Sequence, residues 1–328
     1  MLTISILGSG SFGCAIASVY NKFNFNITLW SHSAEEAQEI KINRENKRCL
    51  PGINIDSKIN ITSNISDVFD SDIIFIVVPS FAVRVTLNLI KNKIKPEAIL
   101  VCLSKGFEES TLELLSDIIK EILPQNKFVI LSGPSHAEEI AKEMTTTLVA
   151  ASENIDTAIY IQKIFSTSFI RIYTNTDIVG VQIGAALKNI IALAIGICDG
   201  MNLGDNAKAA LMTRGLSEIS RLGVAAGANQ KTFSGLSGLG DLIVTCTSLH
   251  SRNRRAGILI GRGQNTDSAI SKIGMTVEGY SATKCAYNLS QKYNIELPII
   301  NEIYNILYKN KDPKKAFENL FSRPYKFE

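Results

Sequence analysis

The chain has 328 residues, of which 45% are hydrophobic and 20% charged, and its net charge is +3. This length allows about two domains, and the composition is that of a globular protein with a sizeable core. The small net charge argues against a nucleic-acid partner.

The first half of the chain alternates predicted strands with predicted helices. Apolar and polar residues alternate from Leu2 to Ile6, which predicts a strand. A glycine-rich segment over 8–13 follows, then a helix over 14–23 and a second strand over 27–30. Helices such as 112–123 separate later apolar runs, which predict strands over 73–78, 99–103, 128–131, 145–151 and 169–173. This alternation predicts a Rossmann-type, doubly wound α/β sheet with parallel strands.

The second half of the chain is helical in pattern. Apolar residues recur at helical spacing along 180–197, and further helices are predicted over 207–226, 283–292 and 299–308. The stretch 180–197 is the most membrane-like. Because Lys188 and Asn189 within it would be costly in lipid, we interpret it as a buried core helix. We divide the chain into an α/β domain over 1–178 and a mostly helical domain over 179–328.

Two features bear on the cellular compartment. The six cysteines include no Cys-x-x-Cys pair, and most have apolar neighbours, which is typical of reduced, buried thiols. The first apolar stretch lacks a basic start and breaks at Gly8, unlike a secretory signal. We therefore expect a cytoplasmic protein without integral membrane contact.

Gly8, Gly10 and Gly13 follow a predicted strand and open a predicted helix, which is the setting of a dinucleotide-binding turn. Gly8 permits the tight turn, Gly10 lets a pyrophosphate approach the backbone, and Gly13 lets the helix pack on the strand. The helix N-terminus then offers unpaired N–H groups to the anion. The alternative is a glycine-rich turn in an unrelated α/β protein.

The end of the second strand bears on the choice between NAD and NADP. An NAD site has Asp or Glu there, on the ribose 2′-hydroxyl. Here the strand ends in Ser31 and His32, and Glu35 and Glu36 come later. Ser31 and His32 could accommodate a 2′-phosphate, which favours NADP(H) slightly over NAD(H). His32 as a surface bystander is the alternative.

Polar residues follow two further strands of the predicted sheet. Lys105 comes after the strand over 99–103, and small residues over 132–137 follow the strand over 128–131. Ligands of open α/β sheets bind beyond the carboxyl ends of the strands. Lys105 could therefore meet a phosphate or a polarised carbonyl. A solvated lysine and a plain turn are the alternatives.

Lys188 lies inside the apolar helix, where an unpaired charge is expensive. Burial lowers the pKa of a lysine and suits it to proton transfer, unless the side chain reaches the surface. Asp241 is the candidate carboxylate to orient it. Arg252 and Asn253 suit a phosphate, because a guanidinium can bind two phosphate oxygens. A flexible basic loop is the alternative for this last segment.

The common hydrolase, nucleotidase and metal-site signatures are missing. The histidines are His32, His136 and His250, and their spacing is not that of metal ligands. Neither Gly-x-Ser-x-Gly nor Gly-Lys-Ser/Thr occurs. We therefore expect no metal site.

Seven motifs in order resemble the bacterial NAD(P)-dependent glycerol-3-phosphate dehydrogenase family over essentially the whole chain. They cover 8–13, 103–108, 132–135, 185–189, 238–242, 251–255 and 277–279. The resemblance implies reversible reduction of dihydroxyacetone phosphate to sn-glycerol 3-phosphate with NAD(P)H, which supplies phospholipid synthesis. Phe12 stands where relatives often have Trp or Tyr, and Thr276 where Val is common. Both should change cofactor packing rather than chemistry.

The resemblance also implies residue roles. Lys188 is expected to exchange a proton with the C2 oxygen, Asp241 to hold Lys188, and Lys105 to contact the substrate near the reacting carbonyl. The expected substrate site, in the cleft between the domains, consists of Lys105, Gly133, Ser135, Lys188, Asn189, Asp241, Thr245, Ser251, Arg252 and Asn253, with the last two on the phosphate. The expected cofactor contacts are Gly8, Gly10, Ser11, Phe12, Gly13, His32, Lys105, Ala137, Arg252, Thr276 and Glu278.

Two other functions compete with this interpretation. A dehydrogenase of the 6-phosphogluconate or hydroxyacid type would also join a nucleotide domain to a helical domain with a Lys-Asn pair, but Gly240-Asp241 followed by Ser251-Arg252-Asn253 argues against it. A non-catalytic NAD(P)-binding sensor would need neither Lys188 nor Asp241. The sequence leaves open whether the chain forms a homodimer.

Overall fold

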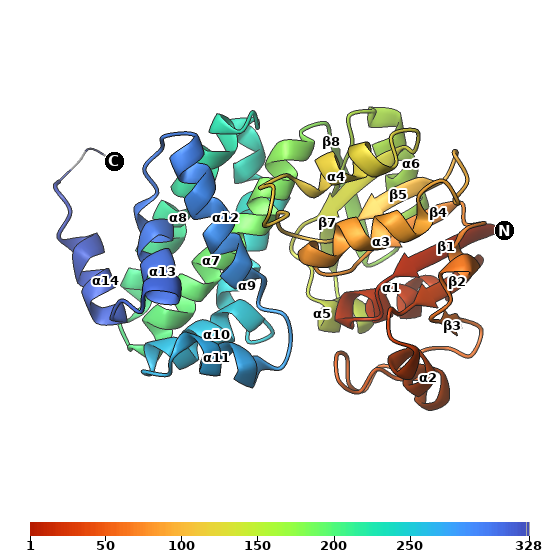
Figure 1. The fold of residues 1–328 in the computed structure, drawn as a ribbon, viewed down its shortest axis with the longest axis horizontal. Coiled ribbons are helices and arrows are strands. Elements are labelled where there is room, and N and C mark those ends of the chain that lie inside the picture. The colour runs from red at the N-terminus through yellow and green to blue at the C-terminus, as the bar shows by residue number, and fades with distance from the viewer. Residues whose placement is uncertain (326, 328) are drawn as a thin grey trace. The chain divides into compact units, whose positions relative to one another are not determined.

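The computed structural model describes residues 1–325 and 327. The chain divides into two compact units. The sheet unit contains Met1–Glu108 and Glu113–Val181, and the helical unit contains Glu109–Leu112 and the chain from Gln182 onward. Figure 1 shows strands in the first unit and helices throughout the second. The α/β class with a helical C-terminal part is therefore confirmed.

The sheet unit contains one eight-stranded sheet in the order β3-β2-β1-β4-β5-β6-β7-β8. Its strands are β1 (Leu2–Leu7), β2 (Phe25–Trp30), β3 (Asn60–Thr62), β4 (Ile73–Ile76), β5 (Ile99–Cys102), β6 (Phe128–Ser132), β7 (Thr146–Ala151) and β8 (Ile170–Asn175). The first six run parallel, whereas β7 is antiparallel to β6 and parallel to β8. The sheet is therefore mixed, with its last two strands reversed.

An aromatic cluster fixes the first helix of the sheet unit against the sheet. The Tyr20 ring lies 4.9 Å from the Phe165 ring, which lies 5.0 Å from the Phe75 ring, both edge to face. The Tyr20 hydroxyl also donates to the carbonyl of Phe165 at 2.7 Å. The helices of this unit are α1 (Ser11–Tyr20), α2 (Ala34–Asn43), α3 (Val83–Ile90), α4 (Leu115–Ile122), α5 (Ala137–Ala141) and α6 (Ile155–Phe165). The glycine-rich turn before α1 is thus held by buried packing at the far end of its helix.

The helical unit packs around α7 (Ile178–Gly200). This helix is long and apolar enough to cross a membrane, but 94% of its most apolar window is buried inside the protein. That burial is characteristic of the core helix of a soluble protein. The other helices are α8 (Asp205–Ala225), α9 (Asp241–Thr247), α10 (Arg252–Gly261), α11 (Thr266–Ile273), α12 (Glu278–Lys292), α13 (Pro298–Lys309) and α14 (Pro313–Phe321).

Glycines bring α7 and α10 into backbone contact. A Cβ added to Gly196 would lie 2.1 Å from the carbonyl oxygen of Arg254, and one added to Gly257 would lie 2.3 Å from that of Leu193. Such distances leave no room for any side chain. The close crossing holds α10 against the C-terminal half of α7, which follows Lys188 and its neighbour Asn189 along the helix.

Candidate active site

The glycine-rich turn leaves open space where a pyrophosphate would lie. Gly8 has φ +122°, and a Cβ on Gly13 would lie 1.9 Å from the carbonyl oxygen of Gly8, so the fold itself requires both glycines. A Cβ on Gly10 would meet no atom within 4 Å. Gly10 is also the N-cap residue of α1, so the first N–H groups of that helix point out of the turn. The turn therefore fits a dinucleotide cofactor.

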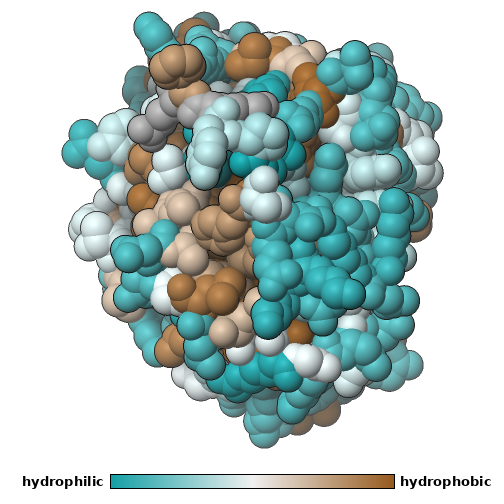
Figure 2. Space-filling view, turned by 90° about the vertical axis from the view of Figure 1, so that its left-hand side faces the viewer, coloured by the Kyte–Doolittle hydropathy of each residue, from teal (hydrophilic) through white to brown (hydrophobic). Residues whose placement is uncertain are grey.

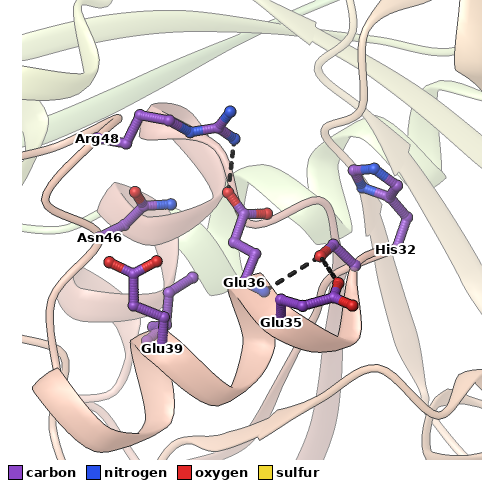
Figure 3. A pocket seen from close by; sticks show the side chains of 8 residues that line it. His32, Glu35, Glu36, Glu39, Asn46 and Arg48 are labelled. Carbon is purple, nitrogen blue, oxygen red and sulfur yellow. Dashed lines mark hydrogen bonds and ion pairs between the residues drawn. The ribbon is translucent and has the colours of Figure 1, made fainter.

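Glu36, in the first turn of α2, carries a carboxylate to which the sequence analysis gave no role. The Glu36 carboxylate accepts hydrogen bonds from the hydroxyls of Ser9 at 2.6 Å and Ser31 at 2.8 Å. It also accepts from the Arg48 guanidinium at 2.8 Å (Figure 3). Ser33 caps α2 and accepts from the backbone N–H of Glu36. The Ser-x-x-Glu pattern of a capping box was the signal that could have indicated this turn.

These contacts keep Glu36 charged. Partial burial raises the pKa of its carboxyl, but the hydrogen bonds from Ser9, Ser31 and Arg48 outweigh burial and hold that pKa below its usual range. A pocket of about 340 Å³ adjoins the carboxylate, lined by His32, Ser33, Glu35, Glu36, Glu39, Ile40, Asn46 and Arg48 (Figure 3). The predicted residue His32 therefore shares a pocket with a charge of each sign.

The loop that carries Lys105 is held by one arginine. Arg84, on α3, donates to Glu108 at 2.6 Å, to Glu113 at 3.2 Å and to Glu121 at 2.7 Å. Glu108 and Glu113 lie three and eight residues after Lys105 along the loop. The pKa of Arg84 is raised, chiefly by its hydrogen bonds with Glu108 and Glu121. These ion pairs order the segment after β5, at the carboxyl edge of the sheet.

The segment after β6 is a tight turn. Gly133 has φ +141°, and an added Cβ would lie 2.8 Å from the carbonyl oxygen of Thr147. The Ser135 hydroxyl donates to the carbonyl of Gly133 at 2.9 Å, and buried Ala137 begins α5. The turn thus brings Gly133, Ser135 and Ala137 to the same edge of the sheet as Lys105.

Lys188 forms a buried ion pair in the helical unit. Its ammonium donates to the Asp241 carboxylate and, at 2.7 Å, to the Thr245 hydroxyl. Lys188 is 6% exposed and Asp241 1% exposed, so the lysine does not reach the surface. The Thr245 hydroxyl in turn donates to the backbone carbonyl of Asp241 at 2.6 Å. An ammonium fixed in this way can give a proton to an oxygen that gains charge.

A tight approach to α7 explains the place of Asp241. A π-helical turn over Leu236–Gly240 directly precedes α9, which begins at Asp241. A Cβ added to Gly184 of α7 would lie 2.8 Å from the carbonyl oxygen of Ser237 in that turn. Lys188 lies one helical turn beyond Gly184. The first turn of α9 therefore presents its carboxylate to Lys188.

Asn189 belongs to a second buried chain of hydrogen bonds. Its side-chain carbonyl accepts from the Asn253 amide at 2.9 Å, and the Asn253 carbonyl accepts from the backbone N–H of Gly279 at 2.9 Å. The chain joins α7, α10 and α12. It fixes the start of α10, where Ser251 caps the helix by accepting from the N–H of Arg254.

The arginines of α10 have different surroundings. Arg254 donates to Asp199 at 2.8 Å and to the carbonyl of Thr247 at 2.8 Å, so it has a structural role. Among the residues that the structure describes, Arg252 has no ion-pair partner within 4.0 Å. It lies at the positive end of α10, a position that attracts anions.

The remaining predicted contacts are local. Phe12 lies in the first turn of α1, Thr276 in the loop before α12, and Glu278 in the first turn of α12. Their contacts with a cofactor stay predictions. Within residues 1–325 and 327, no group of three or more His, Cys, Asp or Glu side chains could hold a metal ion.

Two family models match the chain. The model described as the NAD-dependent glycerol-3-phosphate dehydrogenase N-terminus matches residues 3–158, and that described as the C-terminus matches 177–318. Glycerol-3-phosphate dehydrogenases of Fusobacterium nucleatum and a Thermoanaerobacter species, both named for NAD(P)+, are 49% and 50% identical, covering 100% of this chain and 99% of each relative. A crystal structure from Coxiella burnetii of the same named enzyme is 35% identical with TM-score 0.95, over 98% of this chain and 99% of that one.

Proposed function

The chain belongs to the NAD-dependent glycerol-3-phosphate dehydrogenase family, and on this premise we propose that it interconverts dihydroxyacetone phosphate and sn-glycerol 3-phosphate, with Lys188 exchanging the proton. The observation that carries the proposal is the buried ion pair of Lys188 and Asp241. A lysine is rarely buried unless paired, and here the pair also contacts the Thr245 hydroxyl.

In this proposal, residues of this chain supply the proton and stabilise the negative charge that develops on the C2 oxygen. When bound, NAD(P)H supplies the hydride for C2 of the ketone. The Lys188 ammonium gives its proton to the C2 oxygen as that oxygen gains charge, and takes a proton back in the reverse direction. Asp241 and Thr245 hold the ammonium in position. The cation of Lys105 stabilises the same oxygen.

The start of α10 binds the phosphate group of the substrate in this proposal. Arg252 and Asn253 bind it, supported by the positive end of the helix and by the capped backbone at Ser251. The substrate site further includes Gly133, Ser135, Asn189 and Thr245. The proposed cofactor contacts are Gly8, Gly10, Ser11, Phe12, Gly13, His32, Lys105, Ala137, Arg252, Thr276 and Glu278.

The finer assignments follow from the same proposal. Residues 1–178 form the NAD(P)-binding domain, and residues 179–328 form the helical domain that carries Lys188 and most of the substrate contacts. NADPH is slightly preferred, because Ser31 and His32 directly follow β2. The protein is cytoplasmic, and its product supplies phospholipid synthesis.

A homodimer is also proposed. Figure 2 shows a band of apolar residues beside a large hydrophilic area on one face of the molecule. Exposed apolar side chains of the helical unit include Leu203, Val224 and Phe321. Apolar surface of this kind is often covered by a partner. Sedimentation of the purified protein at twice the monomer mass would support the dimer, and sedimentation at the mass of one chain would contradict it.

The test of the activity is oxidation of NADPH and NADH in the presence of dihydroxyacetone phosphate, with identification of the product. The proposal expects rapid oxidation of the coenzyme and sn-glycerol 3-phosphate as the only product formed from the ketone. If folded protein binds the cofactor but oxidises neither form, the proposed activity is wrong, and a cofactor-binding sensor is the better interpretation.

A further inference from the structure

The loop that follows α2 is tied to the glycine-rich turn at two points. The side-chain amide of Asn46, which is buried, donates to the carbonyl of Ser9 at 2.8 Å. The hydroxyl of Ser11 donates to the carbonyl of Cys49 at 2.6 Å. Arg48 lies between these two anchors. Its backbone is therefore held beside the turn that fits the cofactor pyrophosphate, although its side chain is 70% exposed.

The Glu36 side chain is also held beside the glycine-rich turn, and more firmly than that of Arg48. One carboxylate oxygen accepts from both Ser9 and Ser31, and the other accepts from Arg48. The Glu36 side chain is only 16% exposed. The ion pair therefore joins a fixed anion to a cation whose exposed side chain can move.

The position of the pair relates it to the adenosine ribose. In this fold the end of β2 lies beside the ribose 2′-position, where NADH has a hydroxyl and NADPH has a phosphate. Ser31 directly follows β2, and its hydroxyl donates to the Glu36 carboxylate. A carboxylate accepts a hydrogen bond from a hydroxyl and repels a phosphate, whereas a guanidinium binds a phosphate.

We propose that Glu36 and Arg48 act in opposition to set the ratio in which this chain uses NADH and NADPH. Glu36 accepts the ribose 2′-hydroxyl of NADH, and Arg48 swings from Glu36 to the 2′-phosphate of NADPH. The proposal rests on the proposed function. It accounts for use of both coenzymes by one site, because each charge of the pair favours a different coenzyme.

The test uses the dissociation constants of NAD+ and NADP+, measured by calorimetry, together with kcat/KM for NADH and NADPH. Glu36→Gln should raise the preference for the phosphorylated coenzyme about tenfold, the effect of one charged contact. Arg48→Gln should lower that preference about tenfold. Glu39→Gln is the matched control, since it removes the same charge from the same helix and pocket. It should change the ratio by no more than about twofold.

Two results would overturn the proposal: both variants moving the ratio in the same direction, or neither moving it further than Glu39→Gln does. If Glu36→Gln unfolds, Arg48→Gln decides the test alone, because its side chain is exposed. Binding needs no turnover. A wild type that binds both coenzymes but leaves dihydroxyacetone phosphate unreduced therefore refutes the proposed activity, while the binding ratios still decide the role of the pair.

Discussion

The glycine-rich turn of the sheet unit and the lysine site of the helical unit prepare for their ligands by different means. The turn uses backbone: its N–H groups and the space above Gly10 lie within six residues of sequence. The lysine site uses buried side chains from separate helices, with Lys188 and Asp241 53 residues apart. Damage to the turn should therefore act through backbone geometry, whereas damage to the lysine site should act through charge.

The glycines of the turn give the largest expected effect. Gly13→Ala places a methyl group against the carbonyl oxygen of Gly8, so we expect a loss of about 3 kcal/mol of stability and of cofactor binding. Gly10→Ala meets no protein atom, so it should fold within about 0.5 kcal/mol of the wild type but bind cofactor more weakly. Urea unfolding and calorimetry measure both. Equal stability of the two variants would contradict a backbone-built turn.

Asp241 tests the lysine site through the loss of a charge rather than through a change of backbone geometry. Asp241→Asn leaves the buried Lys188 ammonium without its counter-charge, so we expect a loss of about 3 kcal/mol of stability. Turnover should fall about a hundredfold, because the proton donor is no longer held. Asp205→Asn, at an exposed acid of the same unit, is the matched control and should leave kcat unchanged. Normal kcat in Asp241→Asn would refute its positioning role.

Substitutions of Arg252 and Arg254 distinguish substrate binding from structural stability within α10. Arg252→Gln should raise KM for dihydroxyacetone phosphate about tenfold at unchanged stability, because it removes a charged phosphate contact. Arg254→Gln should instead lower stability by about 2 kcal/mol, because its partner Asp199 is largely buried. Steady-state kinetics and urea unfolding distinguish the two. An unchanged KM in Arg252→Gln means that the phosphate lies elsewhere.

Glu218 gives an effect on stability that is confined to one pH range. Its buried carboxyl accepts from the N–H groups of Ile299 and Ile300 at the start of α13. Burial raises its pKa to about 7, although those N–H groups and nearby arginines lower it. Because the folded-state pKa lies above the unfolded one, its contribution to stability is complete below about pH 4 and is lost as pH rises through 7.

Urea unfolding at pH 5 and pH 8 measures this contribution, with a difference of up to about 3 kcal/mol expected from this one group. Glu218→Gln removes the titrating group and should flatten that difference. A wild type and a Glu218→Gln variant with the same pH dependence would show that Glu218 does not titrate in this range.

The sequence predicted the elements that follow from a local residue pattern. It missed the features that depend on contacts with other parts of the chain. Buried strands such as β4 and β5 are continuous apolar runs and were predicted, whereas β3 has one apolar residue, Ile61, and forms only because β2 offers an edge. The local residue pattern does not show that β7 runs antiparallel to β6, because a buried strand has the same apolar pattern in either direction.

The site follows the same division. The three glycines could be interpreted from their spacing because a turn is local. The contact of Glu36 with Ser9 spans 27 residues, and that of Asn253 with Asn189 spans 64. Such partners depend on how helices pack. Motif order could identify the residues of the helical unit, but only the fold shows which of them touch.

The most direct test of the central claim is the kcat of Lys188→Met, measured with its dissociation constants for NAD+ and NADP+. The matched control is Lys272→Met, at an exposed lysine of the same unit. We predict that kcat falls at least about a hundredfold, as for a lost acid/base group, while both dissociation constants stay within about twofold of the wild type. A kcat close to that of Lys272→Met would contradict the assignment of Lys188 as the proton donor.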